Sequence, residues 1–206
     1  MCAMSEQADN IKTQQPEGGS EEAGAPENKE KSFSLANELL EWAESFVFAI
    51  FVIIMLFTFV FRIVQVDGPS MEDTLHDGDR LILNHFNYTP KRGDIVVLNS
   101  RGLNETIIKR VIAVEGDTIS IDFTNGKVIL NGEELKEDYI KEPTYLQEGR
   151  AIENLTIGEG QVFVMGDNRN HSTDSRSSAV GVVDIDDILG EAVFRLYPVS
   201  DIGSVG

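Results

Sequence analysis

The sequence predicts a mainly β domain that follows one apolar helix near the amino terminus. Short runs rich in Val, Ile and Leu, separated by turn residues, follow one another from residue 80 onward. Such runs are typical of β-strands joined by hairpins. The only long apolar run, Phe46 to Phe61, precedes all of them. No amphipathic helix of convincing length follows that run, so we expect residues 67–206 to form a β-rich domain with antiparallel hairpins and long loops.

Residues 1–31 are predicted to be a disordered acidic tail. They contain no aromatic residue, many Glu, Gln, Gly, Ser and Pro, and three lysines against seven acids. Such a composition cannot bury enough apolar surface to fold. Residues 32–45 are then predicted to form an amphipathic lead-in helix, with Trp42 at the height of a membrane interface.

Residues 46–66 are predicted to form a transmembrane anchor. Phe46 to Phe61 has only Thr58 as a polar residue, and a continuation to Val66 reaches the roughly 20 residues that a span needs. This requires the charged end of Arg62 to extend to the membrane surface.

Two alternatives for this run are a buried core helix and a cleavable secretory signal. A signal has a basic start and a small-residue exit, whereas glutamates at 38, 41 and 44 precede this run and Phe-Arg ends it. A retained anchor is therefore favoured. Its orientation is not decided by charge, because Lys29 and Lys31 before the run are matched by Arg62 after it.

The predicted strands are bounded by turn residues. Asn125 and Gly126 separate two apolar runs and predict a hairpin, and Asn131 and Gly132 predict a second turn. The predicted strands are Arg80–Leu83, Asp94–Leu98, Ile107–Val114, Thr118–Phe123, Val128–Leu130, Gln161–Met165 and Ala192–Tyr197.

Composition excludes several functions. The chain has 17 basic and 35 acidic residues, a formal net charge of −18, which argues against nucleic acid as a partner because phosphate contacts need clustered Lys and Arg. The single cysteine, Cys2, allows no intramolecular disulfide and makes a structural zinc site implausible. The histidines at 76, 85 and 171 are scattered and are interpreted as surface or structural residues. We expect no metal and no cofactor.

Ser70 and Lys109 are the candidate catalytic pair. Ser70 follows the apolar run by nine residues, and a serine hydroxyl needs a neighbouring base to become a nucleophile. Lysine can be that base in place of histidine. On a strand, Lys109 shares one face with Ile107 and Val111, and burial among apolar groups lowers the pKa of an amine. The alternative is an ordinary strand lysine with a solvated amine.

A third polar segment, residues 165–176, follows a predicted strand. Such a run of Asn, Asp, Ser and Arg is often a solvated loop, but it also offers a hydroxyl to orient an amine and an Asp/Arg pair to hold the loop. Three segments thus occur in order behind the apolar run: Gly-Pro-Ser-Met-Glu-Asp-Thr-Leu at 68–75, Ile-Lys-Arg-Val at 108–111, and Gly-Asp-Asn-Arg at 166–169 with Ser172, Asp174, Ser175 and Arg176.

This arrangement closely resembles the bacterial type I signal peptidases, membrane-anchored serine–lysine proteases that remove signal peptides from exported proteins. The resemblance runs from about Phe46 to Ile202 and includes residues 91–97, 112–117 and 189–190. It implies a coiled, mostly antiparallel β-sheet catalytic domain with a smaller inserted β region. It also implies that the protein acts on exported preproteins at the lipid bilayer, as a single-pass monomer with a cytoplasmic amino terminus and an extracytoplasmic catalytic domain.

The resemblance also implies residue roles. Ser70 is the expected nucleophile and Lys109 the expected general base. Ser172 is expected to hydrogen-bond the lysine amine, and Asp174 and Arg176 to shape the site as an ion pair.

The resemblance implies shallow apolar pockets for small side chains before the cut. The expected lining residues are Val66, Met71, Leu75 and Ile108, and plain core packing is the alternative for each.

Two positions depart from the family pattern. Asp73 stands where the family usually has a turn proline. Gly68 stands where some members have a serine that helps to bind the oxyanion, which leaves the backbone N–H of Ser70 and the backbone of Gly68 for that task.

Two rival functions remain. One is a self-cleaving serine–lysine protease like the LexA-like repressors, which carry a DNA-binding module in place of a span. The other is a catalytically idle membrane-anchored β domain that binds exported proteins.

Overall fold

The computed structural model describes residues 35–147, 149 and 151–205. The predicted acidic tail, residues 1–31, and the first residues of the predicted lead-in helix lie outside these. The chain divides into two units, Met1–Glu44 and Ser45–Gly206. The candidate site described below lies wholly in the second unit.

One helix, α1, runs from Leu35 to Val60. From Leu35 onward, the expected lead-in helix and most of the expected anchor are therefore parts of one continuous helix. Glu38 lies in its first turn, where a negative charge stabilises the helix by interacting with the helix dipole. No helix within the described residues combines the length and the apolar character needed to cross a bilayer.

The prediction of a helix through Val66 is wrong after Val60. Residues Phe61–Gln65 form strand β1, which pairs antiparallel with β2, with Ile63 opposite Ile82. The ladder to β2 satisfies the backbone groups that a helix would otherwise pair internally. Val66, which follows the strand, is 2% exposed in the core. Arg62 is an exposed residue of β1.

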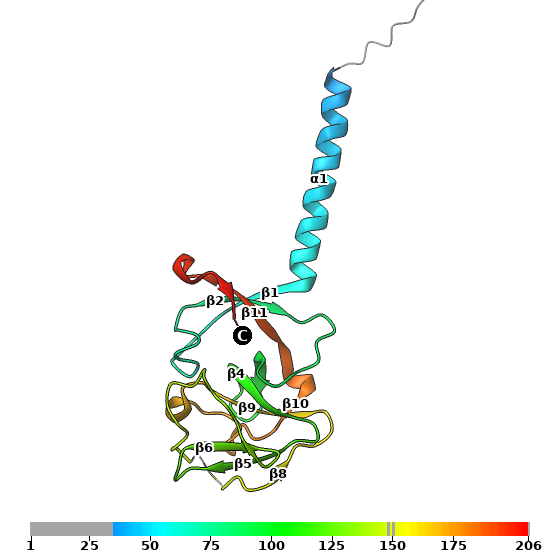
Figure 1. Ribbon diagram of the computed structural model, residues 1–206. Helices are drawn as coiled ribbons and strands as arrows, with labels where there is room; N and C mark the ends of the chain where they lie inside the picture. The colour runs from blue at the N-terminus through cyan, green and yellow to red at the C-terminus, as the bar shows by residue number, and fades with distance from the viewer. Residues whose placement is uncertain (1–34, 148, 150, 206) are drawn as a thin grey trace, which may run out of the picture. The chain divides into compact units, whose positions relative to one another are not determined.

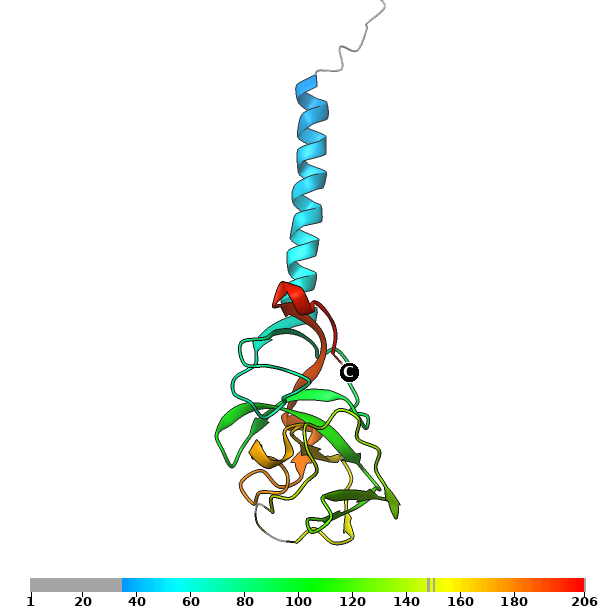
Figure 2. The ribbon, with the colours of Figure 1, turned by 60° about the vertical axis from the view of Figure 1, so that its left-hand side comes forward.

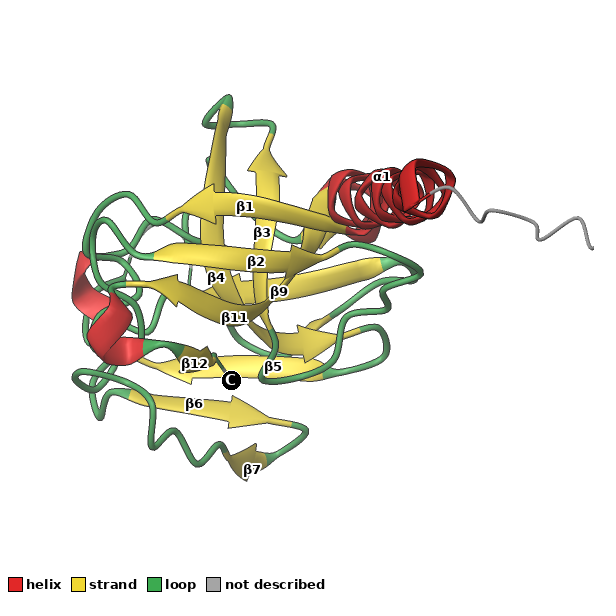
Figure 3. Ribbon diagram, turned by 90° about the horizontal axis from the view of Figure 1, so that it is seen from above, coloured by secondary structure: helices red, strands yellow, loops and turns green. Residues whose placement is uncertain are grey.

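The larger sheet has eight antiparallel strands in the described residues, in the order β1-β2-β11-β3-β4-β9-β10, with β12 paired to β11. Figure 3 shows β1, β2 and β11 running side by side. The strand bounds are β2 Arg80–Asn84, β3 Ile95–Ser100, β4 Glu105–Val114, β9 Gln161–Met165, β10 Val183–Asp184, β11 Ile188–Tyr197 and β12 Gly203–Ser204.

A second sheet is inserted in the sequence between β4 and β9. Its four strands have the order β7-β6-β5-β8, and it lies at the end of the second unit away from β1 (Figures 1 and 2). The bounds are β5 Thr118–Asp122, β6 Lys127–Leu130, β7 Glu133–Glu134 and β8 Leu155–Thr156. This inserted sheet matches the smaller β region that the resemblance implies.

Strand β3 shows how the sequence pattern builds the core. Every residue from Ile95 to Leu98 is buried, because the strand has a core on each face. Ile95 and Val97 pack in one cluster with Leu81 and Leu83, whereas Val96 and Leu98 pack in another. An uninterrupted apolar run is what such a strand requires.

The predicted strands are all present, and both predicted turns lie between paired strands. Strand β11 begins four residues before its predicted start, at Ile188 rather than Ala192. Bulges interrupt its alternation. At Gly190, where φ is +153°, a Cβ would lie 2.7 Å from the Asn84 carbonyl oxygen, so the close approach of β2 requires glycine. The two-residue strands β7, β8, β10 and β12 were not predicted, because an alternating pattern cannot be recognised over two residues.

Candidate active site

Ser70 lies in the loop between β1 and β2, and its neighbours hold this loop against the core. Met71 is 1% exposed and Leu75 is fully buried. The backbone N–H of Leu75 donates to the Met71 carbonyl at 2.8 Å, which closes one turn. Burial of the residues after Ser70 thus fixes the backbone, while Ser70 itself stays partly exposed. The Glu72–Asp73 peptide bond within this loop is cis.

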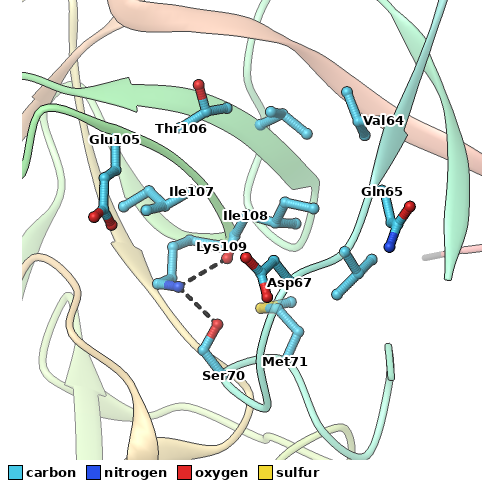
Figure 4. A pocket seen from close by; sticks show the side chains of 12 residues that line it. Val64, Gln65, Asp67, Ser70, Met71, Glu105, Thr106, Ile107, Ile108 and Lys109 are labelled. Atoms are coloured by element: carbon cyan, nitrogen blue, oxygen red, sulfur yellow. Dashed lines mark hydrogen bonds between the residues drawn. The ribbon is translucent and has the colours of Figure 1, made fainter. Parts of the chain in front are cut away.

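Lys109 projects from β4 to the Ser70 hydroxyl. Its Nζ lies 2.8 Å from Ser70 Oγ and 3.0 Å from the Ile108 carbonyl oxygen, as Figure 4 shows. The side chain is almost completely buried, with the residue 3% exposed. Ile107 and Val111, its neighbours on the same face of the strand, both pack in one core cluster.

A cavity of about 380 Å³ opens beside this pair. Three of the four expected lining residues, Val66, Met71 and Ile108, do line it. Figure 4 labels Met71 and Ile108. Leu75 does not line the cavity. All four residues pack in or against one core cluster with Leu81 and Leu83, so the core-packing alternative also describes the three that line the cavity.

Two carboxylates line the same cavity and were not expected there. Asp67 follows the buried Val66, and Glu105 begins β4. Both are exposed residues. Nothing in the local sequence distinguishes them from other surface acids, because only the folding of β4 beside the β1–β2 loop brings them to one cavity.

The loop after β9 supports the Ser70 segment through Asp167. This carboxylate is fully buried and accepts two hydrogen bonds from Arg110, at 2.9 and 2.7 Å. It also accepts one from the Thr74 hydroxyl at 2.6 Å. Three segments distant in sequence therefore meet at one carboxylate. Arg110 and Thr74 had no predicted role, although both lie within the quoted motifs.

The inserted region adds a second layer to this support. The ring of Tyr139 lies 4.2 Å from the Arg110 guanidinium, in the geometry of a cation–π contact. Burial and the nearby Glu137 carboxylate raise the pKa of Tyr139, so its phenol is neutral at physiological pH. Glu137 also forms an ion pair with the buried Arg169.

The segment after β9 contains a buried, hydrogen-bonded group that consists of Ser172, Asp174 and Arg176. The Ser172 hydroxyl donates to Asp174 Oδ2 at 2.9 Å. Arg176 donates to both oxygens of the same carboxylate, each at 2.8 Å. The expected ion pair is thus present. The expected hydrogen bond between Ser172 and the amine of Lys109 stays a prediction.

Gly166 lies where the Ser70 loop and the buried group of Ser172, Asp174 and Arg176 come close to each other. A Cβ there would lie 2.2 Å from Ser172 Oγ and 2.5 Å from the Ser70 carbonyl oxygen. We expect Gly166→Ala to lower kcat by about 10²-fold, because displacing a reacting group by about 1 Å can have an effect of that size. Steady-state kinetics on a preprotein substrate measure this.

Gly203→Ala is the matched control for this substitution. A Cβ at Gly203 meets no atom within 4 Å, so wild-type kinetics are expected. Full activity of the Gly166→Ala variant would show that the contact between these loops does not position Ser70.

The remaining expectations concern the oxyanion site and metals. The Gly68 N–H donates to Asp77 Oδ1 at 2.9 Å, so the expected backbone donor at Gly68 is already engaged. Within the described residues, no group of three or more His, Cys, Asp or Glu could hold a metal ion. None of the three histidines lines the cavity.

Comparison with known proteins identifies the chain. The family model described as signal peptidase, peptidase S26, matches residues 39–197. With this match over most of its length, and with a serine–lysine contact on a mainly β fold, the chain is a serine endopeptidase. It belongs to the signal peptidase family, peptidase S26, and is of the bacterial type I.

Relatives from several bacteria are similar over most of the chain. Signal peptidase I P of Bacillus subtilis subsp. natto is 36% identical, covering 84% of this chain and 96% of that protein. Signal peptidase I of Leptolyngbya laminosa is 38% identical, covering 72% and 75%. A crystal structure of a signal peptidase I from Enterococcus faecalis has 29% identity and a TM-score of 0.41, covering 50% of this chain and 97% of that chain.

Proposed function

We propose that this protein is a membrane-anchored endopeptidase that removes signal peptides from exported preproteins by a Ser70/Lys109 mechanism. The observation that carries the proposal is the 2.8 Å separation between Lys109 Nζ and Ser70 Oγ beside an open cavity. That separation is within hydrogen-bond distance, as a general base requires.

The reaction follows from the two groups in contact. Neutral Lys109 takes the proton of Ser70 as Oγ attacks the scissile carbonyl carbon. The tetrahedral intermediate collapses to an acyl-enzyme, and the leaving amine of the mature protein takes that proton from Lys109. Lys109 then takes a proton from water, whose oxygen attacks the ester. The signal peptide leaves with a new carboxylate, and Ser70 regains its proton.

The state of Lys109 depends on its burial. A buried ammonium loses hydration, so a dry site favours the neutral amine that a base needs. In the proposed mechanism, Ser172 orients this amine, while Asp174 and Arg176 hold Ser172. The hydrogen bond from Ser172 to Asp174 supports the second part of this assignment.

The cavity suits an extended peptide that ends in small side chains. It lies between residues 64–67, at and after the end of β1, and residues 105–109 of β4. β1 is an end strand of the larger sheet. Residues 105–109 of β4 pair with β3, while β9 pairs only from Arg110 onward. The cavity is therefore flanked by two strand edges, one of β1 and one of β4, and within the described residues neither edge has a second partner strand there. Such edges bind peptides as added strands.

The specificity follows from what lines this cavity. Val66, Met71 and Ile108 give the cavity of about 380 Å³ an apolar part beside its polar lining residues. We infer cleavage after an Ala-x-Ala type sequence, which is what export signals present.

Anchoring is proposed from the side chains of α1. All residues from Phe46 to Met55 except Ala49 carry exposed large apolar side chains, which point to every face of the helix. A helix that is apolar all round is usually buried in protein or in lipid. We propose that it anchors the chain as a monomer, with the amino terminus in the cytoplasm and the catalytic domain outside, where signal cleavage sites emerge.

The test is cleavage of a preprotein by the detergent-solubilised full chain. We expect one cut after the Ala-x-Ala sequence, identified by the masses of both products, and no cut when both alanines are replaced by bulky residues. Ser70→Ala should show no cleavage, whereas Ser178→Ala, which alters an exposed serine, should match wild type. Binding of the preprotein without any cleavage by the wild-type chain would favour the idle binding domain instead.

A further inference from the structure

Asn168 holds two successive carbonyl groups of the nucleophile loop. Its side-chain Nδ2 donates to the Pro69 carbonyl at 3.0 Å, and its backbone N–H donates to the Ser70 carbonyl at 3.1 Å. The residue is 2% exposed. It lies in the loop after β9 and is separated from Pro69 by 99 positions in sequence. None of the reaction steps above uses it.

The bond to Pro69 determines where the Ser70 N–H points. The Pro69 carbonyl and the Ser70 N–H belong to one peptide group, which is planar. This peptide bond is trans, since the cis bonds in the described residues lie elsewhere. The N–H therefore points away from the carbonyl oxygen. When Asn168 holds that oxygen, the direction of the Ser70 N–H is fixed as well.

The Ser70 N–H is a donor that this loop can offer to an oxyanion. The nearby Gly68 N–H is engaged by Asp77 at 2.9 Å. The Ser70 N–H donates to no acceptor within the described residues. A hydrogen bond received at the Pro69 oxygen also polarises the peptide group and strengthens the donor at its other end.

The amide oxygen of Asn168 gives an independent indication. Asn168 Oδ1 is buried and has no hydrogen-bond partner in the described part of the chain. A buried acceptor without a partner destabilises the fold. For packing and stability alone, an apolar side chain of similar size would therefore serve as well at this position. Only the hydrogen bond to the Pro69 carbonyl requires the amide group of Asn168.

We propose that Asn168 is a positioning residue that aims the Ser70 N–H at the oxyanion of the tetrahedral intermediate. The inference rests on the proposed Ser70 mechanism and supplies its oxyanion donor. Asn168 does not touch the substrate in this proposal. It acts through the Pro69–Ser70 peptide group, and its removal leaves the N–H present but no longer held in direction.

The test uses Asn168→Leu, which keeps the side-chain volume but removes the donor. We expect kcat to fall by about 10²-fold with little change in KM, at the low end of the loss seen when an oxyanion donor is removed. Thermal unfolding should show no loss of stability relative to wild type. Asn168→Ala, which also retains the backbone bond to Ser70, should show a similar fall in kcat.

A peptide aldehyde provides the readout that a purely structural role would not change. Ser70 Oγ adds to its carbonyl carbon, and the resulting tetrahedral adduct carries the oxygen that the N–H binds. Its affinity should fall in Asn168→Leu by the same factor as kcat/KM, while the affinity for the cleaved signal peptide, measured as a competitive inhibitor, should not change.

Asn170 supplies the matched control. Its Nδ2 also donates to a proline carbonyl, that of Pro143, at 3.1 Å, while its Oδ1 accepts hydrogen bonds from the backbone N–H groups of Tyr145 and Leu146. Asn170→Leu should retain wild-type kcat and aldehyde affinity.

Two results would overturn the inference. One is wild-type kcat/KM in Asn168→Leu, and the other is an equal loss of aldehyde and product affinity, which would indicate a distorted cavity. Failure of the wild-type chain to cleave, or cleavage by Ser70→Ala, would instead overturn the proposed function.

Discussion

Replacing Lys109 with methionine is expected to lower kcat by about 10³-fold or more. General-base catalysis contributes about 10²–10⁴-fold, and Lys109 Nζ is the group placed 2.8 Å from Ser70 Oγ. Methionine fills much of the space of the buried lysine stem without offering a base. The measurement is single-turnover acylation on a preprotein, with circular dichroism to confirm that the variant is folded.

Lys127→Met is the control for the loss of a lysine. Lys127 lies on the inserted sheet in an exposed ion pair with Glu134, so its replacement should leave kcat unchanged. Acylation by Lys109→Met at the wild-type rate would exclude lysine as the base, while the chain could still be a protease by another route.

The pH dependence of the wild-type enzyme follows from the same role. The base acts only when neutral, so activity should fall as pH decreases and the amine takes up a proton. Asp67 and Glu105 line the same cavity, and nearby carboxylates favour the protonated amine. Removing them in Asp67→Asn/Glu105→Gln should therefore move the fall in kcat/KM to lower pH. A flat profile down to acid pH would contradict the mechanism.

Asp167→Ala is expected to destabilise the second unit by about 3–5 kcal/mol, the range for removing one partner of a buried ion pair. Arg110 and Asp167 are 6% and 0% exposed in their side chains, at 2.7 Å. The change leaves the Arg110 charge buried beside Tyr139, and it also removes the acceptor of the Thr74 hydroxyl. Urea unfolding of the solubilised chain measures the free energy of unfolding.

Lys127 and Glu134 provide a matched ion pair at the surface. Their separation is also 2.7 Å, but their side chains are 50% and 58% exposed. Glu134→Ala should cost at most about 1 kcal/mol, because exposed pairs contribute little. Equal losses in the two variants would mean that burial does not determine the contribution of the Arg110–Asp167 pair.

Much of the larger sheet could be predicted because its signals are local. Alternation and apolar runs located β2, β3, β4 and β9, and the Asn125-Gly126 turn located the hairpin of β5 and β6 in the second sheet. The end of α1 could not be predicted, since Phe61, Ile63 and Val64 continue the apolar run past Val60 and neither Gly nor Pro interrupts it there. Only pairing with β2 makes them a strand.

The sequence by itself determined which chemical groups are present and in which order: a serine after an apolar helix, a lysine between β-branched neighbours, and a polar loop behind a buried strand. These are properties of short segments, so periodicity and motif spacing reveal them. The tertiary structure alone decided which groups meet. Ser70 and Lys109 are 39 positions apart, and Asn168 and Pro69 are 99 apart. Their contacts depend on strand register and loop closure, which couple distant segments and leave no trace in any local pattern.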